Sequence, residues 1–127
     1  MSNATAAEIR QAKLFATRRR REAKALPLLL QMKAAGIPTP EMEVKFERTR
    51  EWCFDYAWKG WKIALEVEGG IWTHGRHVRG TGFTRDCEKY NRAAILKWML
   101  LRVTTDIVKD GRAIDTLREA FSARGLE

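Results

Sequence analysis

The fold is decided by residues 52–68, which read WCFDYAWKGWKIALEVE. Apolar residues alternate with smaller or polar ones on both sides of the Lys59-Gly60 pair, a pattern typical of two half-buried strands joined by a tight turn. The same alternation precedes them in residues 42–47, which read MEVKFE. Successive strands with short connections predict an antiparallel meander of three strands, with the large apolar residues of each strand on one face.

Helical patterns flank these strands. Residues 85–98 predict a helix capped by Thr84, and the apolar run 99–103 predicts a buried strand that returns to the sheet. Residues 5–25 predict a first helix, and Pro27 followed by Gly36 predicts a separate short one over 27–36. A last amphipathic helix is expected from Gly111 to Gly125. The expected fold class is therefore mixed α/β (α+β): a three-stranded antiparallel meander, a crossover helix, a further strand and flanking helices.

Length and charge restrict the kind of protein. A chain of 127 residues predicts one domain, with residues 1–36 as a basic N-terminal helical segment of the same domain as 37–127. The net charge is +8, and residues 1–36 hold eight basic residues against two acidic ones. This excess includes the run Arg18, Arg19, Arg20 and Arg21. Such a run attracts nucleic acid through its phosphates, although a solvated helical face explains it about equally well.

The expected surroundings follow from what the composition lacks. No apolar run approaches the roughly 18 residues of a membrane-spanning helix, so no membrane partner is expected. The polar N-terminus does not resemble a secretory signal. Cys53 and Cys87 are too few for a disulfide framework or a zinc site, which favours a reducing, cytoplasmic location.

Three acidic residues are the strongest functional signal. Glu66 and Glu68 are two apart on one strand and project from the same face, while Asp55 occupies the polar face of the neighbouring strand. We expect the three carboxylates to meet in one patch, where their mutual repulsion favours a bound cation. Hard oxygen ligands suit Mg²⁺ or Mn²⁺ rather than zinc. The alternative is a solvated sheet face with alternating charge.

The order of several motifs resembles a known family. Asp55 within FDYA (54–57) and Glu66 and Glu68 within IALEVEGG (63–70) are followed by a loop with histidines, then DCEKYN (86–91) and WMLLRV (98–103). This order is similar to that of the PD-(D/E)XK nuclease superfamily, and in particular of the small very-short-patch-repair-like endonucleases of bacteria and phages. The resemblance covers residues 41–108 and implies a restriction-endonuclease-like core in residues 37–127.

The resemblance also implies a chemistry. Members of this family are metal-dependent nucleases that hydrolyse DNA phosphodiester bonds. Asp55 and Glu66 would hold Mg²⁺ or Mn²⁺, with Glu68 as a third ligand or as the base that orients water. Glu68 stands where the family usually has lysine, and such a lysine can lie on the following helix, so Lys89 is the candidate and Lys62 the second choice. Glu43 is a weaker extra acid.

The same resemblance suggests which residues contact DNA. His77 would donate a proton to the leaving oxygen or, like His74, Arg76, Arg79 and Arg85, contact the backbone; for both histidines a plain loop position is the alternative. So small an enzyme offers little surface for a long recognition site, which favours double-stranded or branched DNA with a distorted structure, or a homodimer. The setting would be the cytoplasm of a bacterium or of a phage-infected host cell. A catalytically inactive nucleic-acid-binding module is the competing hypothesis, and a protein-interaction subunit the third.

Overall fold

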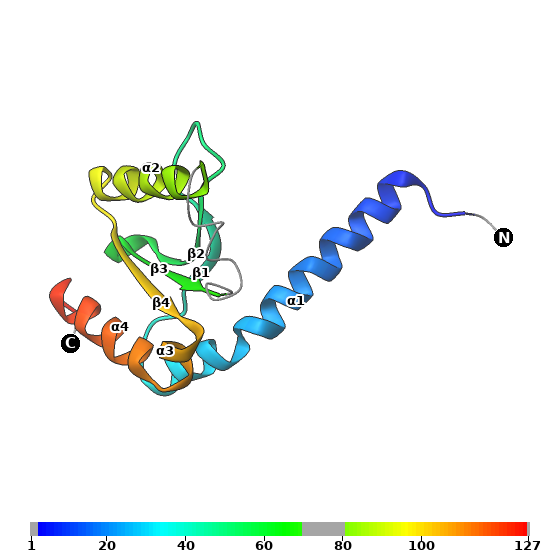
Figure 1. The fold of residues 1–127 in the computed structure, drawn as a ribbon. Coiled ribbons are helices and arrows are strands. Elements are labelled where there is room, and N and C mark those ends of the chain that lie inside the picture. The colour runs from blue at the N-terminus through cyan, green and yellow to red at the C-terminus, as the bar shows by residue number, and fades with distance from the viewer. Residues whose placement is uncertain (1–2, 70–80, 127) are drawn as a thin grey trace.

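The computed structural model describes residues 3–69 and 81–126. It is a mixed α+β fold in which one four-stranded sheet separates α2 from α3 and α4 (Figure 1). The elements in chain order are α1 (Ala6–Ala34), β1 (Glu41–Lys45), β2 (Cys53–Trp58), a 3₁₀ turn (Lys59–Trp61), β3 (Ile63–Glu68), α2 (Thr81–Ile95), β4 (Met99–Thr104), α3 (Thr105–Lys109) and α4 (Arg112–Ala123).

The strand order confirms the meander and the returning strand. The sheet order is β1-β2-β3-β4, and β2 is antiparallel to both β1 and β3. After α2 crosses one face, β4 joins β3 in parallel over its whole length. A parallel neighbour needs such a crossover, which explains why the helix stands between the two strands in the sequence.

In β1 and β2, the apolar side chains change from one face of the sheet to the other at Glu43 and Asp55. Met42 and Tyr56 pack on the side of α4, whereas Val44 and Phe54 pack on the side of α2. The prediction that each strand keeps its large apolar residues on one face is therefore wrong for β1 and β2, whereas it is confirmed for Ile63, Leu65 and Val67 of β3. Glu43 lies opposite Asp55 in the register and has a φ of +53°, a left-handed conformation that rotates β1 at this point.

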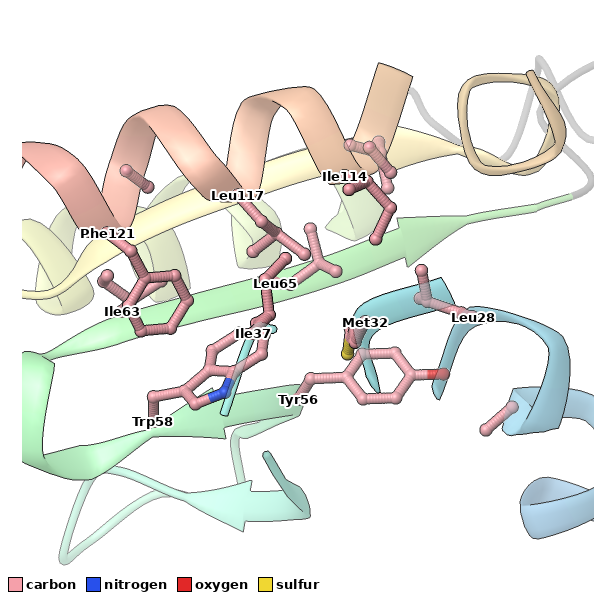
Figure 2. Packing of buried hydrophobic residues seen from close by; sticks show 14 residues of the cluster. Leu28, Met32, Ile37, Tyr56, Trp58, Ile63, Leu65, Ile114, Leu117 and Phe121 are labelled. Atoms are coloured by element: carbon pink, nitrogen blue, oxygen red, sulfur yellow. The ribbon is translucent and has the colours of Figure 1, made fainter. Parts of the chain in front are cut away.

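Each face of the sheet has its own apolar cluster. The larger cluster joins Ile63 and Leu65 of β3 to Leu117 and Phe121 of α4, and it also takes in Trp58 (Figure 2). The indole of Trp58 meets the Phe121 ring edge-on at 5.2 Å between centroids. The smaller cluster, under α2, is formed around Val44, Phe54, Ala57, Ala64 and Ala93. Small alanines on this face allow α2 to approach the sheet closely.

The N-terminal segment is one helix rather than two. Pro27 lies inside α1 although an interior proline removes a hydrogen bond and costs about 3 kcal/mol. Ala25, Leu28 and Met32 are buried in the larger cluster, and this packing holds the chain helical on both sides of the proline. The predicted end is confirmed, because Gly36 has a φ of +75° and the next N–H donates to the Met32 carbonyl at 2.9 Å.

The remaining differences from the sequence prediction are at element ends. The crossover helix starts at Thr81 and ends at Ile95, a few residues earlier than predicted, and the short α3 was not predicted. The part of α1 before Ala25 projects away from the sheet and is largely exposed (Figure 1). In residues 3–69 and 81–126, no helix is both long and apolar enough to cross a membrane.

Candidate functional site

Asp55 lies where β2 and β3 stop pairing through their backbones. The last pair on this side is Tyr56 with Leu65, and beyond it the Asp55 carboxylate Oδ2 accepts a hydrogen bond from the Val67 N–H at 2.9 Å. A side chain therefore takes the place of a strand carbonyl. This bond fixes the carboxylate beside the strand that carries Glu66, as the sequence predicted for these two acids.

Glu66 on β3 has a buried carboxylate that pairs with a lysine from the helix α2. Its side chain is only 9% exposed, and it accepts a hydrogen bond from Nζ of Lys89 on α2, whose side chain is 17% exposed. Buried acids are rare unless they are paired, so the lysine is a required partner. The structure thus brings the helix lysine named from the sequence to the central acid. Lys62, the second choice, instead donates to the Leu96 carbonyl at 3.2 Å.

The environment of Glu66 changes its acidity. The pKa of Glu66 is raised to about 7, and burial is the largest cause. The hydrogen bond and the charge of Lys89 lower this pKa, and the nearby carboxylates of Asp55 and Glu68 raise it. A carboxyl group with a pKa near neutrality gains or loses its proton readily at physiological pH. Such perturbed groups are common where proteins bind cations or carry out acid–base chemistry.

Glu68 is held by two side chains that the sequence analysis did not single out. Its Oε1 accepts from Nε of Arg102 at 3.0 Å and from the hydroxyl of Tyr90 at 3.3 Å. The guanidinium of Arg102 also lies 4.3 Å from the centroid of the Tyr90 ring. Tyr90 lies one position after Lys89 on α2, but the partnership of Arg102 depends on the register of β4, which no local sequence pattern encodes.

The expected cluster of three metal-binding carboxylates is not seen. Within the described parts of the chain, no group of three or more His, Cys, Asp or Glu side chains is placed to hold a metal ion. Glu68 is engaged by Arg102, so the acids placed beside each other are Asp55 and Glu66. Two carboxylates still suit Mg²⁺ or Mn²⁺, because Mg²⁺ usually binds through one or two carboxylates and keeps several waters.

A cleft of about 560 Å³ opens beside Asp55, between α1, the sheet and α3. Its walls include apolar side chains from these elements, such as Leu28 and Met42. Arg21, Lys24 and Lys109 contribute positive charge to the same cleft. The weaker acid Glu43 also lines it and pairs with Arg21 at 3.7 Å. Asp55 therefore borders a space lined by three basic residues on the α1 and α3 side of the sheet, whereas Glu66 and Lys89 do not line this cleft.

The other predicted contacts to nucleic acid are only partly described. The arginines of the run 18–21 are all exposed on α1, and Arg85 is exposed on α2. Consecutive residues of a helix point about 100° apart, so the four arginines surround α1 rather than forming one face. His74, Arg76, His77 and Arg79 lie outside the described residues.

Comparisons of the chain with family models, with curated proteins and with solved structures find no match.

Proposed function

We propose that the protein is a metal-dependent DNA endonuclease whose active site is formed by Asp55, Glu66 and Lys89. The observation that carries the proposal is the convergence of three elements: an acid from β2, a buried acid from β3 and a lysine from α2. The resemblance to the nuclease superfamily implies such a site at Asp55 and Glu66, with Lys89 as the first and Lys62 as the second candidate for its lysine. A buried acid with a pKa near 7 beside a second acid is the kind of group that a divalent cation stabilises in its charged form.

Each residue of the proposed active site has a separate role. Asp55, fixed by the Val67 N–H, and Glu66 would supply oxygen ligands to Mg²⁺ or Mn²⁺. A divalent cation bound there lowers the pKa of a coordinated water and offsets negative charge on a phosphate. Lys89 keeps the Glu66 carboxylate oriented and adds positive charge next to the reacting phosphate. Glu68, bonded to Arg102, acts from a neighbouring position rather than as the third ligand expected.

The charge distribution supports DNA as the substrate. The chain carries a net charge of +8, the exposed arginines of the run 18–21 lie on the projecting helix, and three basic residues line the cleft beside Asp55. A cationic cleft next to a metal-binding acid suits a phosphodiester backbone, whose affinity comes largely from counterion release. We further propose that the substrate is structured or branched DNA and that the protein acts as a homodimer. We propose the cytoplasm as its location, because the free thiols of Cys53 and Cys87 would stay reduced there.

Cleavage of supercoiled plasmid and of a four-way DNA junction with Mg²⁺ or Mn²⁺ tests the proposal. We expect Asp55→Asn and Glu66→Gln to reduce the rate on the order of 100-fold, the loss typical when one group that stabilises the transition state is removed. Asp115→Asn, an exposed acid on α4, is the matched control and should cleave normally. Equal rates in the wild type and the two site variants would refute the assignment of these residues.

A catalytically inactive nucleic-acid-binding module is the second candidate. The observation that favours it is that two of the acids already have cations of their own, Glu66 with Lys89 and Glu68 with Arg102. Binding of DNA that weakens steeply with salt, without cleavage under Mg²⁺, Mn²⁺ or Co²⁺, would support this candidate over the enzyme.

A further inference from the structure

Arg102 is the best-positioned cation of the site that the proposed reaction does not yet use. It pairs with Glu66 in the parallel register of β3 and β4, so the two residues are direct neighbours across the sheet. Its Nε donates to Glu68 at 3.0 Å, and its guanidinium packs on the Tyr90 ring. Two neighbours, one from β3 and one from α2, therefore fix the plane of this guanidinium.

The fixed guanidinium keeps donors available. Arginine has five N–H donors, and the bond to Glu68 uses only the one on Nε. Among residues 3–69 and 81–126, no other hydrogen bond of this group is seen. The side chain is 48% exposed, so its two terminal nitrogens can reach a ligand from solvent. A planar pair of such donors matches two oxygens of a phosphate.

Tyr90 contributes through its hydroxyl as well as its ring. Burial and the nearby Glu68 carboxylate raise the pKa of Tyr90, so its hydroxyl remains protonated and donates to Glu68 at neutral pH. Glu68 therefore accepts from two donors at the same oxygen. The acid that does not join a metal-binding cluster instead orients an arginine.

We propose that Arg102 binds a phosphate of the DNA strand at the active site, with Glu68 and Tyr90 as its positioning residues. This inference rests on the proposed function in taking DNA as the ligand. Formal charges agree with it: the Glu66–Lys89 and Glu68–Arg102 pairs are each neutral, Asp55 and one divalent cation sum to +1, and one phosphodiester carries −1. Loss of the arginine charge would leave the site with an excess negative charge that repels the strand.

Binding without cleavage tests the inference. A fluorescein-labelled 20-base-pair duplex is titrated with protein in EDTA between 50 and 200 mM NaCl, and anisotropy gives the affinity. Each lost phosphate contact lowers the slope of log affinity against log salt by about 0.9. We expect the slope for Arg102→Gln to be reduced by this amount. Between 50 and 200 mM NaCl, the factor by which its affinity falls should therefore be about 3-fold smaller than the factor for the wild type. Arg118→Gln, an exposed arginine on α4, is the matched control and should keep the wild-type slope.

Two further variants separate a phosphate contact from a structural role. Arg102→Lys keeps the charge and should restore the salt slope, but it lacks the two-pronged geometry and should not restore the cleavage rate. Tyr90→Phe keeps the stacked ring, removes the hydroxyl bond to Glu68, and should lower kcat more than it raises KM. Unchanged melting temperatures would show that the variants are folded.

The outcomes distinguish this inference from the proposed function. A wild-type slope for Arg102→Gln, or an equal loss in Arg118→Gln, would overturn the role of Arg102 even if the protein cleaves DNA. The expected slope change in a protein that never cleaves would support Arg102 while refuting the nuclease. Absence of any DNA binding by the wild type would overturn both.

Discussion

Replacing Glu66 with glutamine should change how the stability of the protein depends on pH. Burial raises the pKa of Glu66 to about 7 in the folded protein, whereas the ordinary value of 4.5 applies to the unfolded chain. The folded state therefore binds the proton more tightly than the unfolded state does. By linkage, the free energy of unfolding is highest when the carboxyl is protonated and falls as pH rises from about 4.5 to about 7.

The size of the effect follows from the same two values. Each pKa unit corresponds to about 1.4 kcal/mol, so the interval between 4.5 and about 7 amounts to on the order of 3 kcal/mol. Glutamine has the shape of the protonated acid and still accepts a hydrogen bond from Lys89, but it does not titrate. We therefore expect Glu66→Gln to gain on the order of 3 kcal/mol of stability relative to the wild type as pH rises across this interval.

Urea denaturation followed by tryptophan fluorescence measures this difference at pH 4.5, 5.5, 6.5 and 7.5. Trp58, one of five tryptophans, is buried in the larger cluster, so its part of the emission changes on global unfolding. Glu119→Gln, an exposed acid on α4, is the control and should follow the wild-type pH profile. If the curves of wild type and Glu66→Gln run parallel across these pH values, the burial argument for this carboxyl is wrong.

Four further outcomes test other parts of the structure. Mn²⁺ at ten times its dissociation constant should stabilise the wild type by about 1.4 kcal/mol at pH 7.5, and Asp55→Asn should lose this shift in a thermal melt. Gly36→Ala should cost about 1 kcal/mol because the φ of Gly36 is +75°, whereas Gly60→Ala, without such a φ, should cost less in the same urea assay. Pro27→Ala should raise the free energy of unfolding by up to about 3 kcal/mol, and an unchanged value would show that the proline is not strained in α1. Leu117→Ala removes a fully buried side chain and should cost about 2–5 kcal/mol by chemical denaturation.

The sequence predicted the features that depend on neighbouring residues along the chain. The alternation in residues 52–68 predicted the paired strands, whereas Lys89 was named only through the family resemblance, as the lysine that can lie on the following helix. The exchange of faces at Asp55 was missed because it depends on the left-handed conformation of Glu43 in the adjacent strand. The continuity of α1 across Pro27 was missed because burial against the sheet, a tertiary effect, outweighs local propensity.

The pairing of side chains between β3 and β4 is the part of the site that could not be predicted from the sequence. Glu68 and Arg102 are 34 residues apart, and the parallel register, which pairs Arg102 with Glu66, brings the Arg102 side chain within reach of Glu68. Without that register, the spacing of Glu66 and Glu68 suggested one cluster of like charges. The structure instead gives each glutamate its own cation, while Asp55 bonds to a backbone N–H.

This pairing identifies the residue on which the two candidate functions diverge. Glu66 and Glu68 are each bonded to a positively charged side chain, so an added cation gains little from them unless it also binds Asp55. Asp55 lies beside the cleft and accepts a hydrogen bond from a backbone N–H. This donor is neutral, so it does not cancel the negative charge of the carboxylate. A nuclease needs this charge to recruit a metal ion. A binding module would bind DNA better with a neutral residue here, since the acid repels phosphate.

Asp55→Asn should therefore weaken metal binding and cleavage if the protein is an enzyme, but tighten DNA binding in EDTA in either case. An enzyme would show both effects in the same variant, and a binding module would show only the second.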